Sequence, residues 1–486
     1  MKTTFRMMKT KHLSLLLAVL AGGFLMSCEE DDGAENALLD AQNEINVVDV
    51  TTHDGRPFST GVEPQSNAKY VGGPGGGVMM QGFYWDVPAG GTWWNTVKNK
   101  TTAWANAGIK AIWLPPVSKA QNGPYSMGYD PTDYYDFGNY NQNGTVETRF
   151  GSKTELQALI TAAHGQSMEV YADIVINHNS GGQSEANQYT GGNTWTNFNG
   201  VASGKFKRTQ HDFHPNWVHS NDGGSFGGFP DLCHDVPYVQ DWLWGRSDAV
   251  AKYYKNTMKF DGWRFDYVKG FEPWVVNSWN NAVGGFSVGE LWDSDVNYLN
   301  WWANNANSSV FDFAAYYKMN DAFDGNNLNK LNDDMMWKRN AYKAVTFVTN
   351  HDTDEIYNKM LAYAYILTHE GYPCIFYRDY ETWLDKNKLN NLIWIHNQKA
   401  TGNTSILYTD TDEYVARRNG YGGNPGLIVY INNSNSWLTR WVPTNWNNTQ
   451  IKDFTGHSGW YPTTQSGGWV QIQCPPKSYS VWSPNI

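Results

Sequence analysis

Eight short apolar runs, separated by longer segments, constrain the fold of this 486-residue chain more than any other feature. Amphipathic stretches such as Lys153–His164 and Trp242–Met258 fill most of the gaps, and Lys388–Lys399 would be the last of them. Short buried strands that alternate with helices form parallel sheets, and eight is the number that a closed barrel requires. We therefore expect an α/β fold built on a (β/α)8 TIM barrel. The expected strands are Val78–Tyr84, Ala111–Leu114, Glu169–Ile176, Gly262–Asp266, Phe286–Leu291, Val310–Phe313, Ala344–Thr349 and Cys374–Tyr377.

Two segments depart from this alternation. Residues 177–245 are rich in Gly, Asn, His and Trp and contain no clear helix, and a loop of that length inside a compact domain usually has a function. After residue 401 come short β-like pieces with turn signals between them. We expect a barrel formed by residues 71–176 and 246–400, a loop-rich domain inserted after strand 3 at 177–245, and a C-terminal antiparallel β-sandwich at 401–486.

The N-terminus has the features of an export signal. Basic residues precede the apolar run Leu13–Met26, which is too short to span a bilayer. The sequence Leu25-Met26-Ser27-Cys28 resembles a bacterial lipoprotein cleavage box with Cys28 as the lipidated residue; the alternative is an ordinary signal peptide with an incidental cysteine. Residues 1–28 would then be the signal peptide and residues 29–70 a flexible tether. We expect an exported bacterial lipoprotein, located at the outer membrane or cell surface or facing the periplasm.

Charge and cysteine content narrow the class of protein. The net charge is −11 and only 17% of residues are charged, so the surface repels phosphate backbones and nucleic acid is not an expected partner. The three cysteines after Cys28 allow at most one disulfide, so packing must hold the core.

Three acidic residues follow apolar runs that are far apart in the sequence. Asp266, Glu290 and Asp352 each lie at or just beyond the end of an expected strand, where the chemistry of β/α barrels is located. A lone aspartate in a loop is more often a turn or cap residue. Three acidic residues that all lie at strand ends favour a shared functional site over that alternative. Two carboxyl groups that face each other across a sugar can cleave a glycosidic bond.

Four motifs in order resemble the conserved regions of the α-amylases, and the similarity runs from about Val78 to the C-terminus. They are Asp173–His178, Gly262–Gly270, Gly289–Trp292 and Phe347–Asp352. Two further stretches, Ser126–Pro131 and Phe226–Asp231, look most like the plant-like and archaeal α-amylases. One position departs from the wider family, because Gly270 stands where many members have histidine. Sugar contacts that other branches of the family make on the leaving-group side therefore cannot be assigned directly to this chain.

The resemblance implies a retaining, endo-acting α-amylase that cuts α-1,4-glucosidic bonds in starch or glycogen. Asp266 would be the nucleophile, Glu290 the general acid and then base, and Asp352 a group that grips the sugar in the transition state. Glu290 must then carry a proton near neutral pH, which requires a raised pKa. The residues expected to contact or orient the sugar are Tyr129, His178, Arg264, Lys269 and His351.

The resemblance also implies metal ions in the inserted segment, which would be a metal-binding domain B. The side chains of Asn177, Asp222 and Asp231, with the carbonyl groups of Gly224 and Gly270, would bind Ca²⁺, which prefers many oxygen ligands. Asx turns in a Gly-rich loop are the alternative.

A zinc site is a second expectation in the same segment. His214, His219 and Cys233 match a Zn²⁺ site known among archaeal relatives. Unliganded polar residues of a wet loop account for these three residues equally well.

Two other functions are left open by the residues. A transglycosylase on the same fold would share the covalent intermediate, and product analysis would separate it from a hydrolase. A non-catalytic surface glycan-binding lipoprotein could dispense with one of the acids, yet this chain retains all three. The expected partners are α-glucan polysaccharides and, through the lipid anchor, a membrane; the expected oligomeric state is a monomer.

Overall fold

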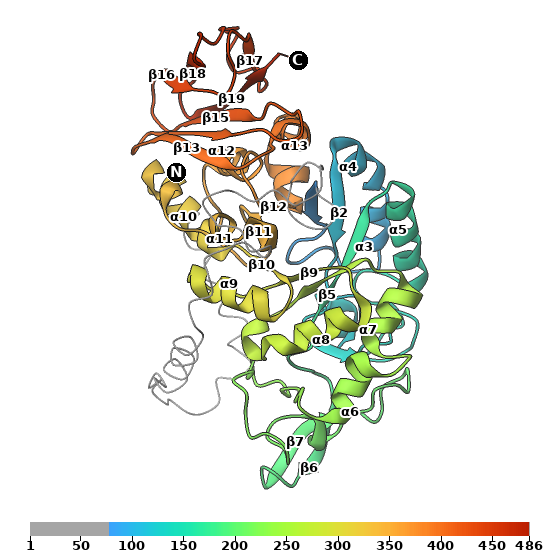
Figure 1. Cartoon of the computed structure of the whole chain (residues 1–486). Helices are drawn as coiled ribbons and strands as arrows, with labels where there is room; N and C mark the ends of the chain where they lie inside the picture. The colour runs from blue at the N-terminus through green and yellow to red at the C-terminus, as the bar shows by residue number, and fades with distance from the viewer. Residues whose placement is uncertain (1–76, 486) are drawn as a thin grey trace, which may run out of the picture. The chain divides into compact units, whose positions relative to one another are not determined.

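The computed structural model describes residues 77–485, and its central element is a closed barrel of eight parallel strands (Figure 1). The strands follow one another as β1, β2, β5, β8, β9, β10, β11 and β12, and β12 pairs with β1 to close the barrel. Each expected strand overlaps one of these, so the (β/α)8 TIM barrel is confirmed. Their bounds are β1 Val78–Gln81, β2 Ile109–Trp113, β5 Glu169–Ile174, β8 Gly262–Phe265, β9 Phe286–Gly289, β10 Ser309–Phe311, β11 Ala344–Phe347 and β12 Tyr372–Phe376.

Helices cover the outside of the barrel and pack one apolar face against it. In α5 (Lys153–Gly165) the buried residues Leu156, Leu159, Ile160 and Ala163 fall on one side of the helix. The helix begins at a capping box, in which Ser152 and Glu155 each satisfy a backbone N–H of the other. The other α-helices between β1 and the end of the barrel are α3 Trp93–Lys98, α4 Thr101–Ala107, α6 Pro237–Gln240, α7 Val250–Tyr253, α8 Pro273–Val283, α9 Val296–Asn305, α10 Phe313–Phe323, α11 Met336–Arg339, α12 Lys359–Ile366 and α13 Lys386–Lys399.

Short helical turns of other types connect these elements. The helix expected over Trp242–Met258 is interrupted, because Gly245 ends one turn and Arg246 adopts an extended conformation before α7 begins. Within this interruption the Arg246 side chain donates a hydrogen bond to Asp248 at 2.6 Å. The 3-10 helices are η3 Gly123–Tyr125, η4 Gln210–Asp212, η7 Val268–Gly270, η8 Leu328–Asn332 and η9 Ala341–Lys343, and the π-helical turns are η5 Asp241–Gly245, η6 Tyr254–Met258 and η10 Asp379–Trp383.

Small antiparallel hairpins extend from the loops that follow β2 and β5. The first consists of β3 (Lys119–Ala120) and β4 (Pro131–Asp133), and the second of β6 (Gln183–Asn187) and β7 (Gly192–Asn197). The loop after β5 returns to the barrel, where the Leu232 N–H donates to the Asn177 carbonyl at 2.9 Å. This contact fixes the end of the long loop beside the carboxyl end of β5.

The C-terminal domain is an antiparallel sandwich, as expected, and one of its sheets faces two different cores. Its larger sheet has the order β13-β14-β15-β19-β17, and a two-stranded sheet of β16 and β18 covers one side of it. Along β15, Val429 and Ile431 pack into the barrel core, while Ile428 and Tyr430 pack beneath the two-stranded sheet. The bounds are β13 Thr404–Thr409, β14 Glu413–Arg418, β15 Leu427–Asn432, β16 Leu438–Pro443, β17 Ile451–Asp453, β18 Trp469–Cys474 and β19 Ser478–Pro484.

The expected membrane anchor and the cysteines can be compared with the described part of the chain. The proposed signal peptide, Cys28 and the tether at 29–70 lie outside the described residues. None of the helices within residues 77–485 combines the length and the apolar character that a bilayer span needs. In the same part of the chain Cys233, Cys374 and Cys474 are buried free thiols, so no disulfide cross-links residues 77–485.

Candidate active site

The ends of β8 and β9 bring two of the three acids together. Phe265 and Gly289 are paired in register, so Asp266 and Glu290 follow at the same edge of the barrel. The Glu290 N–H donates to the Phe265 carbonyl at 2.9 Å and fixes this register. Gly289 is required here, because a Cβ at this position would lie 2.1 Å from the Trp302 ring. The close packing of α9 on β9 therefore sets the position of Glu290.

One buried guanidinium gathers the acidic groups. Arg264 lies two residues before Asp266 on the same face of β8, and its side chain is 1% exposed. Its Nη1 atom donates to Asp173 at 2.8 Å and to Asp266 at 2.7 Å. Its Nη2 atom lies 2.7 Å from Oε1 of Glu290. Asp266 and Glu290 therefore sit on either side of a single positive charge.

The environment of Glu290 favours its protonated form. Burial and the charges of Asp266 and Asp352 together raise the pKa of Glu290 to about 8, against the opposing charge of Arg264. The Tyr267 N–H donates to Oε2 of Glu290 at 3.3 Å. A carboxyl group that keeps its proton near neutral pH can act as a general acid.

Asp352 and His351 approach from the loop after β11. Oδ2 of Asp352 lies 3.1 Å from Nε2 of His351, and the Asp352 side chain is 40% exposed. Protein atoms crowded around this carboxyl still raise its pKa. Burial and the charge of Arg264 lower the pKa of His351 well below its usual value, so the ring is neutral. Since the Gln81 amide donates to Nδ1 at 3.0 Å, the proton of His351 sits on Nε2, which lies 2.9 Å from the Tyr129 hydroxyl and 3.1 Å from Asp352.

Tyr129 connects this loop to β5. Its hydroxyl donates to Oδ2 of Asp173 at 2.9 Å and lies 2.9 Å from Nε2 of His351. The Trp113 indole donates to the same Asp173 oxygen at 3.0 Å. Asp173 therefore ties Arg264, Tyr129 and Trp113 into one buried network below the acids.

An aromatic wall that the sequence reasoning did not identify flanks the site. Trp85 stacks on Tyr129 at 5.9 Å and 22° and on His351 at 6.3 Å and 18°. It remains 43% exposed, so one ring face is open to solvent. Its position just beyond β1, in Gly82-Phe-Tyr-Trp85, was the available signal. A flat exposed ring beside the acids is suited to the apolar face of a sugar.

Two of the expected sugar contacts have other partners in this structure. His178 is fully buried, its Nε2 atom lies 2.9 Å from the Tyr129 carbonyl, and Phe226 stacks over it at 4.7 Å. Lys269 is 41% exposed and pairs with Asp293 at 2.8 Å. Their contacts with a sugar stay predictions.

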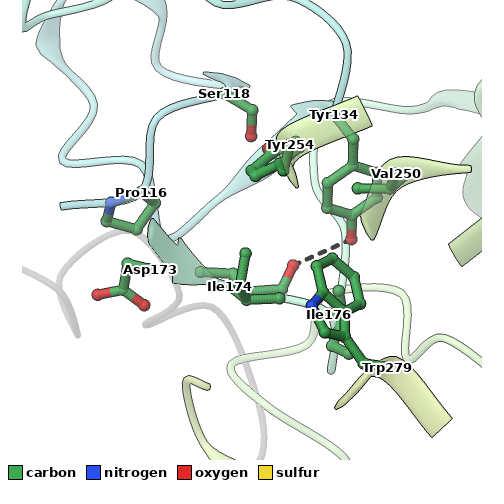
Figure 2. Close-up of a pocket in the computed structure, with 10 residues that line it drawn as sticks. Pro116, Ser118, Tyr134, Asp173, Ile174, Ile176, Val250, Tyr254 and Trp279 are labelled. Atoms are coloured by element: carbon green, nitrogen blue, oxygen red, sulfur yellow. Dashed lines mark hydrogen bonds between the residues drawn. The ribbon is translucent and has the colours of Figure 1, made fainter. Parts of the chain in front are cut away.

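A small pocket near Asp173 belongs to the packing of the barrel. It is lined mainly by apolar and aromatic side chains of β5 and the covering helices, among them Ile174, Tyr254 and Trp279 (Figure 2). The Tyr134 hydroxyl, also in its wall, donates to the Val175 carbonyl at 3.0 Å. The Asp173 carboxyl points away from these side chains (Figure 2). The pocket is thus separate from the acidic groups at the strand ends.

The expected calcium ligands form a cradle of oxygen atoms. A Cβ placed on Gly224 would lie 2.4 Å from the Gly270 carbonyl, 2.6 Å from Oδ1 of Asp231 and 2.8 Å from Oδ1 of Asn177. The two side-chain oxygens are buried and have no hydrogen-bond partner within residues 77–485. Burial and the charge of Asp231 raise the pKa of Asp222 to about 6. Unpaired buried oxygens and crowded carboxylates are what a divalent cation would satisfy, so the donor set fits Ca²⁺.

The fourth and fifth expected calcium ligands are less open. The Gly224 carbonyl accepts a hydrogen bond from the Asn177 amide at 2.7 Å, and Oδ1 of Asp222 accepts one from the Gly224 N–H at 3.0 Å. Both oxygens retain a lone pair for an ion.

The expected zinc residues are less closely gathered. Among the His, Cys, Asp and Glu side chains of the part of the chain that the structure describes, one set of three has ligand atoms that all lie within 4.8 Å of one another: His214, Asp222 and Asp231. The His219 side chain is 47% exposed and lies 3.9 Å from Asp235. Cys233 is buried. The His214 ring nevertheless lies 5.9 Å from that of His219, and the same histidine interacts with the Cys233 side chain, so zinc stays a prediction.

Comparisons with known proteins agree on one family. Residues 427–483 match the family model described as Alpha-amylase C-terminal. The chain is 30% identical to the alpha-amylase of Geobacillus stearothermophilus, over 87% of this chain and 89% of that protein. It is also 30% identical to the alpha-amylase of Bacillus licheniformis, over 84% and 93%. A probable alpha-amylase of Arabidopsis thaliana is 27% identical over 63% of this chain and 76% of its own length. The relatedness thus extends to bacterial and plant members.

Solved structures share the fold. An Anoxybacillus alpha-amylase superimposes with a TM-score of 0.65 at 20% identity, covering 84% of this chain and 96% of the other. A cyclomaltodextrin glucanotransferase with three domains also gives a TM-score of 0.65, at 22% identity, covering 85% and 100%. The fold alone therefore does not separate hydrolases from glucanotransferases.

Proposed function

This chain belongs to the α-amylase family and is a glycoside hydrolase, and from that premise we propose that it is a retaining, endo-acting α-amylase. It would hydrolyse α-1,4-glucosidic bonds in starch, glycogen and maltooligosaccharides by double displacement. The observation that carries the proposal is the Arg264 guanidinium, which contacts both Asp266 and Glu290 while the pKa of Glu290 is raised to about 8.

In the first step Asp266 attacks the anomeric carbon and Glu290 gives its proton to the glycosidic oxygen. The bond to the leaving chain breaks, and a covalent glycosyl-enzyme forms on Asp266. Arg264 donates a hydrogen bond to the Asp266 carboxyl at 2.7 Å and orients it for attack. In the second step Glu290 takes a proton from water, which attacks the same carbon from the face opposite Asp266. Two inversions give net retention.

Asp352 and His351 would hold the hydroxyl groups of the reacting sugar. The Asp352 carboxyl is exposed enough to accept hydrogen bonds from a substrate. Its Oδ2 atom also lies 3.1 Å from Nε2 of His351. Such bonds accelerate the reaction to the extent that they are stronger to the flattened transition state than to the substrate. Trp85 and Tyr129 would supply the stacking surface beside them.

We propose that Asn177, Asp222, Asp231 and the carbonyl groups of Gly224 and Gly270 hold Ca²⁺. The ion would supply positive charge that ties the long loop after β5 to η7 (Val268–Gly270), and it would be structural. Because Asn177 adjoins His178 and Gly270 follows Lys269, the cradle lies directly beside the expected sugar contacts. A Zn²⁺ ion at His214, His219 and Cys233 is a weaker proposal on the same loop.

Location and assembly complete the proposal. Cys28 would carry a lipid that anchors an exported enzyme at the outer membrane or cell surface, or facing the periplasm, with residues 29–70 as tether. The enzyme would act as a monomer on α-glucan.

Product analysis on soluble amylose tests the reaction. A hydrolase releases new reducing ends, initially in the α-anomeric form, with a rapid fall in chain length. A transglycosylase would redistribute chain lengths with few new reducing ends, and a pure binding protein would leave the polymer unchanged. The relatives named as alpha-amylases favour the first outcome.

A further inference from the structure

The outer face of the two-stranded sheet in the C-terminal domain carries two half-exposed tryptophans. Trp441 on β16 is 50% exposed and Trp469 on β18 is 47% exposed. Their neighbours Val442 and Val470 are buried against the larger sheet, so both indoles project to the opposite side. We call this surface the ribbon face. Its residues are Thr439, Trp441, Pro443, Trp469, Gln471 and Gln473.

Strand register places the two tryptophans side by side. Trp441 lies directly opposite Gln471, and Pro443 lies directly opposite Trp469. Trp441 and Trp469 are therefore diagonal neighbours, whose separation in an antiparallel pair is about 7–8 Å. Both indole side chains are about half exposed, so their edges reach solvent. The two rings are close enough to meet neighbouring sugars of one chain, and their polar edges are free to bond hydroxyl groups.

The ribbon face has no ionisable side chain in a chain of net charge −11. Arg440, the nearest charged residue on β16, points to the other side, where it donates to Glu413 at 2.8 and 3.0 Å. The remaining polar groups are amides and a hydroxyl, which both donate and accept hydrogen bonds. An uncharged surface of flat rings and amides is complementary to a neutral polyhydroxylated polymer, and it gives an anionic one no attraction.

The aromatic surface continues beyond the strands. Gln473 donates to the Ser458 hydroxyl at 2.7 Å, and that hydroxyl accepts from the backbone N–H of Trp460 at 3.3 Å. Trp460 is 42% exposed and Tyr461 57%. Isolated exposed aromatic residues are common, but a cluster on one uncharged face indicates a binding surface.

The larger sheet separates the ribbon face from the acids. One side of that sheet packs on the barrel core and the other beneath β16 and β18 (Figure 1). The outer side of the two-stranded sheet therefore faces away from the barrel. A glucan bound there lies apart from the acids at the strand ends.

We propose that the ribbon face is a second α-glucan-binding site, at which Trp441 and Trp469 stack on adjacent sugars and Gln471 bonds their hydroxyl groups. This proposal rests on the proposed function for the identity of the polymer. The site holds the enzyme on long or insoluble α-glucan while the acids act on another segment. Short oligosaccharides, which reach only the acids at the strand ends, do not need it.

Affinity electrophoresis in gels that contain amylopectin tests the site. The full chain with Glu290→Gln serves as parent, so that the polymer stays intact. Trp441→Ala with Trp469→Ala in this parent is expected to weaken retardation at least tenfold. The matched control, Trp441→Phe with Trp469→Phe, keeps two flat rings and is expected to remain retarded like the parent. Equal retardation of the alanine pair, or equal loss in both pairs, overturns the proposal.

Three controls separate glucan binding at the ribbon face from other effects of the alanine pair. With Glu290 intact, the alanine pair should hydrolyse a short maltooligosaccharide with kcat/KM within twofold of the unmodified chain. If the proposed reaction were wrong, this assay would be blank for every variant while retardation would still report on the ribbon face. Retardation by hydroxyethylcellulose as strong as by amylopectin would overturn the α-glucan assignment. A change from dimer to monomer in the alanine pair, seen by sedimentation, would make a second copy of the chain the occupant.

Discussion

Nη2 of Arg264 lies 2.7 Å from Oε1 of Glu290, yet neither atom has a hydrogen-bond partner of normal geometry within residues 77–485. The contact is electrostatic and not directional. Nη1 of the same arginine, in contrast, donates well-formed hydrogen bonds to Asp266 and Asp173. The guanidinium thus holds the Asp266 carboxyl in a fixed position, while it leaves Glu290 free to gain and lose a proton. That asymmetry is what two carboxyl groups with different roles require.

Replacing Glu290 by Gln is expected to lower kcat/KM on soluble starch by about 10²- to 10⁴-fold, because the amide can neither donate a proton to the leaving oxygen nor activate water. Release of reducing ends measures the effect. Glu272→Gln is the matched control, since Glu272 is exposed and its side chain caps nothing. Undiminished turnover in Glu290→Gln would remove Glu290 from the reaction.

Activity should fall on the alkaline side because the acid must be protonated. With the pKa of Glu290 raised to about 8, kcat/KM is expected to decline about tenfold per pH unit above that value. The pH profile of kcat/KM on a maltooligosaccharide measures it. A profile that stays flat up to about pH 10 would contradict this assignment.

The same pKa has a consequence for stability. The folded state holds the Glu290 proton more tightly than the unfolded chain, whose pKa is near 4.5. The resulting stabilisation is fully present below pH 4.5 and is lost as pH rises through about 8. Relative to the unmodified chain, Glu290→Gln should therefore gain in melting temperature between about pH 5 and about pH 9. A constant difference across that range would show that the carboxyl titrates normally.

Removal of calcium should lower stability and activity together. An ion that binds only the folded state at 100 times its dissociation constant adds about 2.7 kcal/mol, so EDTA is expected to lower the melting temperature. Asp231→Asn should reduce this response, because Oδ1 of Asp231 lines the cradle. Asp235→Asn, at a side chain 44% exposed and outside the cradle, should respond like the unmodified chain. Indifference of the unmodified chain to EDTA would refute the site.

Gly289→Ala should reduce both stability and activity. The added methyl group would lie 2.1 Å from the Trp302 ring, and forced overpacking costs about 1–3 kcal/mol. Displacement of β9 would also move Glu290. Thermal unfolding and starch hydrolysis measure the two effects. Gly165→Ala is the control, since a Cβ there meets nothing within 4 Å and should change neither quantity.

The barrel and the grouping of the acids could be predicted because both follow from strand ends. A short apolar run indicates a buried strand, and parallel strands place their carboxyl ends on one face, so Asp266, Glu290 and Asp352 had to meet if the barrel formed. The ends of helices were harder. Nothing in Trp242–Met258 indicated that Arg246 would leave the helix to bond Asp248.

Contacts between side chains could not be predicted from a linear pattern. That Arg264 reaches Asp173, Asp266 and Glu290 depends on how three neighbouring strands are staggered. The burial of His178 beneath Phe226 depends on the return path of a long loop, which local propensity does not determine. Sequence alone does not identify Trp85 as a site residue, because an aromatic residue after a strand is far more often part of the core.

The two-sided packing of β15 limits how this enzyme can be rebuilt. Val429 and Ile431 belong to the same buried cluster as the barrel and its helices, on a strand that packs against α12, so a chain truncated near residue 401 would leave this apolar surface bare to water. Exchange of this domain for that of a relative would have to match those side chains as carefully as any interior position. The C-terminal domain is therefore an integral part of the folded enzyme and cannot be treated as an interchangeable module.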